Sequence, residues 1–117
     1  MRIQFPALLL AVASSLLPGC AVNAPTPSSK ITASPVPELK YADYNCAGLT
    51  AALESLARRR LDLIRAQEQR IKSSNVQDAI LGVGQGDGAE ASELSNVMGE
   101  QAAATKVFNA KRCEYNR

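Results

Sequence analysis

Four glycines alternate with other residues from Gly82 to Gly88, and this run constrains the fold more than any other feature of the chain. Glycine at every second position breaks an α-helix, so the helix-like stretches on either side must be separate elements. A phosphate-binding loop is not expected, because no Gly-Lys-Ser/Thr follows the run. A calcium loop is not expected either, because Asp87 lacks the acidic residues that should precede it. We therefore expect an all-α fold over residues 43–117, an antiparallel two-helix hairpin resembling a coiled coil, with its turn near 82–88.

The first predicted helix begins near Asp43, a candidate N-cap. When its residues are placed at 100° intervals, the apolar side chains form one stripe over about seven turns; they are Cys46, Leu49, Leu53, Leu56, Ala57, Ile64 and Ile71. Arg60 lies inside this stripe, and we expect it to snorkel or to pair with a carboxylate on the facing helix. The Ser-Ser-Asn sequence at 73–75 predicts a kink or fraying, with another turn or two up to residue 81.

The second predicted helix runs from about Glu90 to about Lys111. Its apolar positions are Leu94, Val97, Met98, Ala102, Ala104 and Phe108. If the hairpin is closed by Cys46 and Cys113, facing residue numbers add up to about 159, which is the sum of those two positions. This register places Arg60 opposite Gly99 and Glu100.

An apolar stretch occupies residues 3–17, directly after the basic Arg2. About fifteen helical residues span roughly 22 Å, which is short of the ~30 Å hydrocarbon core of a membrane. The stretch is therefore typical of a cleaved signal peptide over residues 1–19 rather than of a transmembrane helix.

The signal ends in Leu17-Pro18-Gly19-Cys20, which resembles the cleavage site of bacterial lipoproteins. The match holds at Leu17, Gly19 and Cys20, whereas Pro18 departs from the usual residue and predicts slower processing. We expect a diacylglycerol on the Cys20 thiol, cleavage before this residue and acylation of the new amino group by a palmitate-like chain. The alternative is ordinary signal cleavage after Ala24, which would release the protein from the membrane.

The cysteine count agrees with a lipid on Cys20. Of the three cysteines in the chain, a lipidated Cys20 leaves Cys46 and Cys113, and the oxidising periplasm favours a disulfide between them. Two free buried thiols are the alternative. A zinc site is not expected, because two thiolates without any histidine leave half of the tetrahedron unfilled.

Residues 20–42 are rich in proline and serine and predict a linker between the lipid and the helices. Proline fixes φ and removes backbone donors, so an α-helix does not persist in such a stretch. At about 3.1 Å per residue, a polyproline-like chain of this length extends roughly 65 Å from the membrane.

The stretch from Tyr44 to Cys113 resembles a group of small proteobacterial lipoproteins. They share a Tyr-x-Cys start, a long helix, a Gly-Val-Gly turn and a closing run with Gly-Glu and Lys-x-Cys. The matching residues here are Tyr44, Cys46, Gly82-Val83-Gly84, Leu94, Gly99-Glu100, Ala103, Lys111 and Cys113. The chain departs from the pattern at residues 85–88, Gln-Gly-Asp-Gly, where the group often has a bulky apolar and aromatic segment. The resemblance implies a disulfide-closed helical hairpin in the cell envelope, and it supplies no reaction.

Composition narrows the function classes. Histidine is absent, which removes imidazole acid–base catalysis and imidazole metal ligation. The formal net charge of +2 provides no strongly basic face for nucleic acid. We expect a non-enzymatic envelope lipoprotein without cofactor or small-molecule substrate. Ala21, rather than Asp, follows Cys20 and favours the periplasmic face of the outer membrane. The alternative is a membrane-active, lysis or toxin-like lipoprotein, suggested by the arginine run at 58–60.

A partner surface is expected on the first helix. Leu61 and Leu63 fall on opposite flanks of the apolar stripe, which makes the apolar arc wider than one facing helix covers. Exposed apolar flanks commonly mark association sites. We therefore expect a homo-oligomer, such as a four-helix bundle, or docking on an envelope protein. The alternative is that both are isolated surface leucines.

Overall fold

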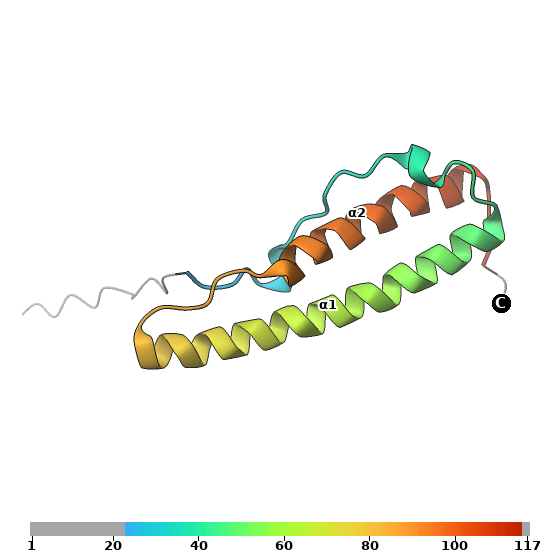
Figure 1. Cartoon of the computed structure of the whole chain (residues 1–117). Helices are drawn as coiled ribbons and strands as arrows, with labels where there is room; N and C mark the ends of the chain where they lie inside the picture. The colour runs from blue at the N-terminus through green and yellow to red at the C-terminus, as the bar shows by residue number, and fades with distance from the viewer. Residues whose placement is uncertain (1–22, 116–117) are drawn as a thin grey trace, which may run out of the picture.

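The computed structural model describes residues 23–115 and confirms the all-helical hairpin. Helix α1 (Cys46–Leu81) and helix α2 (Ala89–Ala110) pack side by side and run antiparallel, joined by the glycine-rich loop (Figure 1). Two short 3-10 helices, η1 (Ser28–Lys30) and η2 (Glu38–Tyr41), precede them in a segment that lies along the hairpin. Residues 23–115 contain no strand. The lipidation site Cys20 lies outside the described residues.

Helix α1 ends at Leu81, where the sequence predicted its last turn, but it begins later than predicted and has no break at residues 73–75. Its N-cap is Asn45, whose side-chain oxygen accepts a hydrogen bond from the Gly48 N–H at 2.8 Å, so the prediction of Asp43 as the cap is wrong. An amide side chain two residues nearer to the first helical residue satisfies an otherwise unbonded backbone donor. The helix continues through residues 73–75 without a break and ends at Gly82, which has a left-handed φ of 74°.

The buried seam of α1 follows a heptad spacing. Its buried residues lie seven or fourteen positions apart in two rows, Leu49 with Leu63, and Leu53 with Gln67 and Ser74. A 3.5-residue period drifts by about 20° per heptad relative to a straight-helix wheel and produces a left-handed supercoil. The seam therefore moves away from the stripe that the wheel predicted, and Leu63 becomes part of it.

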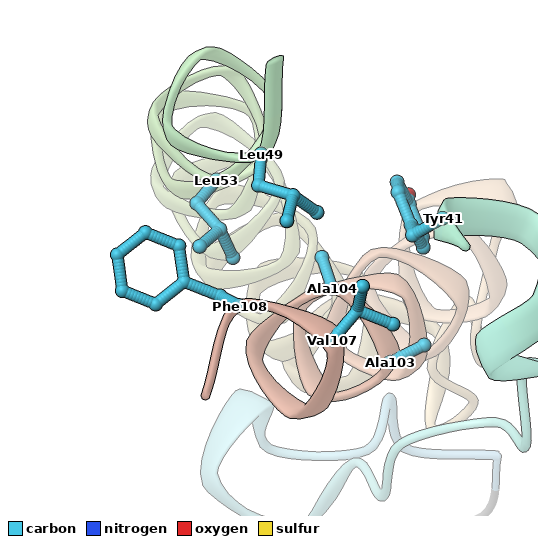
Figure 2. Close-up of a cluster of buried hydrophobic side chains, with 7 residues drawn as sticks. All are labelled: Tyr41, Leu49, Leu53, Ala103, Ala104, Val107 and Phe108. Atoms are coloured by element: carbon cyan, nitrogen blue, oxygen red, sulfur yellow. The ribbon is translucent and has the colours of Figure 1, made fainter. Parts of the chain in front are cut away.

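The helices meet in a register close to the one predicted. The guanidinium of Arg70 bonds the Glu90 carboxylate at 3.1 Å, and Arg60 bonds the Gln101 amide oxygen at 3.2 Å. Both pairs have residue numbers that add up to within two of 159. The apolar core is concentrated at the disulfide end of the hairpin (Figure 2); its buried members are Tyr41, Leu49, Leu53, Ala103, Ala104, Val107 and Phe108.

Residues 23–44 form a third layer, which we call the strap. The strap runs parallel to α2, from the loop at one end to the disulfide at the other (Figure 1). The expectation of a free, extended tether is therefore wrong for residues 23–42. Prolines prevent an α-helix here, but they do not prevent docking, and the aromatic ring of Tyr41 is buried against α2.

The strap is also shorter than an extended chain. Ser34 lies beside Ser95 and Lys40 beside Glu100. Five residues of helix rise roughly 8 Å, whereas six residues of polyproline helix span roughly 19 Å. The 3-10 turn of η2 and the bowed path of the chain take up the difference, so the predicted reach of roughly 65 Å does not apply to the docked strap.

Candidate functional site

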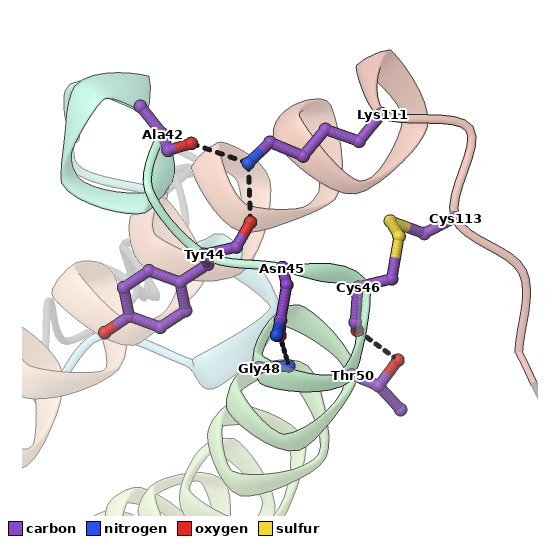
Figure 3. Close-up of a disulfide and its surroundings, with 8 residues drawn as sticks. All are labelled: Ala42, Tyr44, Asn45, Cys46, Gly48, Thr50, Lys111 and Cys113. Carbon is purple, nitrogen blue, oxygen red and sulfur yellow. Dashed lines mark hydrogen bonds between the residues drawn. A yellow bond between two sulfur atoms is a disulfide. The ribbon is translucent and has the colours of Figure 1, made fainter.

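The disulfide closes the open end of the hairpin. Cys46 is the first residue of α1 and Cys113 follows the last turn of α2, with their Cα atoms 5.4 Å apart (Figure 3). The predicted pairing is confirmed. A cross-link between positions 67 residues apart restricts the unfolded chain strongly, which corresponds to about 4 kcal/mol by chain entropy.

Lys111 ties the strap to the same end. Its ammonium group donates hydrogen bonds to the carbonyl oxygens of Ala42 and Tyr44, at 2.6 and 2.5 Å (Figure 3). These carbonyls lie where the chain leaves η2 and turns into α1, so they have no helical partner of their own. The end of the strap, the start of α1 and the end of α2 are thereby fixed together.

A second polar cluster joins the strap to the outer face of α2. The carboxylate of Glu100 pairs with the ammonium of Lys40 and accepts a hydrogen bond from the Tyr41 hydroxyl at 2.8 Å. The Lys40 bond is the main reason that the pKa of Glu100 lies below its usual value, and the Tyr41 bond adds to it. Burial, followed by the hydrogen bond to Glu100, raises the pKa of Tyr41 well above its usual range. The cluster therefore holds one charged carboxylate against one neutral phenol.

The predicted register placed Arg60 opposite Glu100, but the two residues do not pair. Arg60 bonds the neutral amide of Gln101 instead, because Glu100 lies on the face of α2 that the strap covers. This second covered face of α2 was not predicted, since a single hairpin seam was expected.

A third polar cluster fixes the start of the strap near the glycine-rich loop. Asp87 accepts hydrogen bonds from the backbone N–H and the hydroxyl of Thr26, both at 2.6 Å, and from the Gln67 amide at 3.0 Å. The Thr26 hydroxyl bond is the main cause of the lowered pKa of Asp87. Gln67 also donates to the Thr26 carbonyl at 2.7 Å. Its own amide oxygen is buried without a hydrogen-bond partner among the described residues.

The glycines of the loop make room for the strap as well as for the turn. The Gly86 N–H donates to the Asn23 carbonyl at 2.6 Å. A Cβ on Gly84 would lie 2.8 Å from that carbonyl oxygen and 2.5 Å from the Ser74 hydroxyl oxygen. The expected turn is present, and its glycines also allow Asn23, at the start of the strap, to pack against the loop.

The two leucines proposed as an interaction surface lie in different environments. Leu61 is 54% exposed, whereas Leu63 is 4% exposed in the seam. The prediction for Leu63 as an exposed flank is therefore wrong, because the heptad drift places it at the helix interface. Leu61 remains available on the outer side of α1, and its role in association stays a prediction.

An apolar surface that was not predicted lies at the loop end of the hairpin, and we call it the tip. Its exposed side chains are Val76, Ile80, Leu81 and Val83. The signal was present, because four large apolar residues fall within eight positions where no helix was expected to cover them. The apolar stripe was predicted only for the residues before 73–75, because a kink was predicted there.

The rest of the described surface offers few groups that could bind a ligand or a metal ion. An apolar hollow lies between η2 and the end of α2, lined by Glu38, Leu39, Ala42, Val107, Ala110 and Lys111. The Lys111 amine in this hollow is already bonded to two carbonyls. Among residues 23–115, no cluster of three or more His, Cys, Asp or Glu side chains is placed to hold a metal ion.

Comparisons with protein families, with curated proteins and with solved structures gave no match for this chain. Within the part of the chain that the structure describes, neither helix combines the length and apolar character needed to cross a membrane.

Proposed function

We propose that this chain is a bacterial envelope lipoprotein, anchored through Cys20 to the periplasmic face of the outer membrane. The observation that carries the proposal is the disulfide, because Cys46 and Cys113 account for two of the three cysteines. The third is Cys20, which stands at the lipoprotein-like cleavage site Leu17-Pro18-Gly19-Cys20. An oxidised pair beside a lipid-bearing cysteine fits a protein exported across the inner membrane.

We further propose that the protein acts as a non-enzymatic interaction or scaffold module. In support, the carboxylates of Asp87 and Glu100 are engaged in contacts that hold the strap, rather than being directed into a cleft. Leu61 provides an exposed apolar contact for a second copy or an envelope partner.

The lysis or toxin-like alternative receives no specific support from the arginine run. Arg59 pairs with Glu93 and Arg60 bonds Gln101, so two of the three arginines make contacts within the hairpin.

The intact mass of the protein extracted from native membranes tests the anchor. The expected mass is that of a chain starting at Cys20 with a diacylglycerol and an additional acyl group. A chain starting at Pro25, or one without any acyl mass, refutes the proposal. Crosslinking in the same membranes then tests the scaffold role, with Leu61→Glu as the variant expected to lose crosslinked species. A dose-dependent lytic defect on overexpression, absent from a Cys20→Ser variant, would favour the toxin-like alternative.

A further inference from the structure

The tip carries the largest group of neighbouring exposed apolar side chains among the described residues. Val76 is 61% exposed, Ile80 75%, Leu81 69% and Val83 45%. Val76 and Ile80 lie one helical turn apart at the end of α1, and the other two follow directly in the last turn and the loop. Isolated surface leucines are ordinary, but four large apolar residues at one end of an elongated molecule form a patch.

Charge is nearly absent from this end of the molecule. Residues 73–86 contain one charged side chain, Asp78. The opposite end, by contrast, carries Lys40, Lys111, Arg112 and Glu114 around the disulfide. A neutral apolar tip is suited to the boundary between lipid headgroups and acyl chains, where exposed charges are unfavourable.

The start of the strap lies against the loop that follows the tip. Asn23 bonds the loop at Gly84 and Gly86, and Ser74 bonds the neighbouring Gln85 N–H at 2.9 Å. Asn23 is therefore level with Ser74 along the hairpin. Figure 1 shows the beginning of the described chain next to this loop.

The tip and Cys20 are each only a few residues of chain away from the level of Ser74 and Asn23. Leu81 lies seven residues beyond Ser74 on α1, which is roughly 10 Å along the helix axis. Cys20 lies three residues before Asn23, and three residues of chain span at most roughly 11 Å. The lipid-bearing residue and the apolar tip can therefore lie in the same plane.

From this coincidence we infer that the tip is a membrane-contact surface. Ile80, Leu81 and Val83 insert among the lipids of the bilayer that holds the Cys20 anchor, and the hairpin stands on the membrane. The 36 residues of α1 are roughly 54 Å long, so the disulfide end and η2 are presented about that far from the lipid surface. This inference rests on the proposed lipidation of Cys20.

The absence of tryptophan from the chain makes the test direct, because one introduced tryptophan is the only indole fluorophore. Ile80→Trp reports on the tip, and Val83→Trp is a second reporter from the loop. Leu39→Trp is the matched control, since Leu39 is 83% exposed on η2 at the other end. Full-length lipidated protein is reconstituted into vesicles of phosphatidylethanolamine and phosphatidylglycerol, with and without brominated phosphatidylcholine. Circular dichroism and intact mass confirm that each variant is helical and acylated.

We expect blue-shifted emission from the tip reporters and quenching by brominated lipid of roughly twofold or more, as for side chains inserted 5–10 Å. Leu39→Trp should be unaffected in the same vesicles. Acylated protein that floats with the vesicles while both tip reporters remain unquenched overturns the inference and leaves the anchor intact. A blue shift without lipid quenching that grows with protein density assigns the tip to a second copy and also overturns it. Protein that neither floats nor carries acyl mass refutes the anchor itself, and the membrane role of the tip falls with it.

Discussion

Gly99 is the position at which one added methyl group should separate the strap from the hairpin. A Cβ on this residue would lie 1.9 Å from the Ser34 carbonyl oxygen and 2.9 Å from its carbon. These are backbone atoms, so no side-chain rotation relieves the clash, and the strap has to move away from α2. Elsewhere in a helix interior, Gly→Ala is expected to stabilise by about 1 kcal/mol.

The cost of Gly99→Ala follows from what the crossing holds. The Ser34 N–H donates to the Ser95 carbonyl at 2.9 Å, the two serine hydroxyls are 2.7 Å apart, and the Ser95 hydroxyl bonds the Thr32 carbonyl at 2.7 Å. Losing three hydrogen bonds costs roughly 3 kcal/mol, which leaves a net loss of about 2 kcal/mol after the gain in helix propensity. For a domain of this size, the melting temperature should fall by roughly 10 °C.

Urea denaturation followed by circular dichroism measures the loss, and limited trypsin digestion at Lys30 and Lys40 reports on release of the strap. We expect both sites to be cleaved faster in Gly99→Ala while the helical signal is retained. Asn96→Ala, on the exposed face of the same helix, is the matched control and should stabilise slightly. If Gly99→Ala is as stable as the control and its strap equally protected, the strap does not cross α2 at this residue.

Three further predictions concern the disulfide, the seam and the strap cluster. Reduction should lower the free energy of unfolding by about 4 kcal/mol, and a Cys46→Ala/Cys113→Ala variant should match the reduced protein in urea titrations; equal midpoints before and after reduction would contradict the cross-link. Leu63→Ala should cost about 2–4 kcal/mol in the same assay and Leu61→Ala under about 1 kcal/mol, whereas equal costs would mean that the seam is misplaced. Because the pKa of Glu100 is lower in the folded protein, the contribution of this carboxylate to stability is present above the usual pKa of 4.5 and is lost as pH falls below it. Glu100→Gln should therefore reduce the difference in the free energy of unfolding between pH 7 and pH 3. An unchanged difference would contradict this.

Local sequence determined the hairpin, its turn and its closure. Alternating glycines at 82–88 cannot continue a helix, whatever surrounds them. The apolar residues of the first helix repeat at helical spacing, which requires a facing partner. Cys46 and Cys113 occupy equivalent ends of the two helices once the chain folds back, so their pairing follows from the turn. Each of these inferences depends on residues close in sequence or on simple register.

The details of α1 depended on contacts that a wheel does not contain. Leu63 is buried because the seam of α1 repeats every seven residues, a 3.5-residue period, whereas the wheel assumed 3.6. Gln67 and Ser74 continue the seam although both are polar, because the strap and the loop provide hydrogen-bond partners for them. Residues 73–75 stay helical for the same reason, since the hydroxyl of Ser74 is engaged by the loop.

The strap was decided by tertiary structure alone. Its composition predicts a tether, because proline and serine disfavour helix and strand, and composition does not show whether such a chain has a surface to dock on. That surface exists only after α2 forms, when Gly99 and Ala103 come to lie on one face and leave space for the chain near Ser34 and for the buried ring of Tyr41. The sequence by itself therefore determined which segments are helical and how they reverse, and the packed helices determined where the N-terminal segment lies.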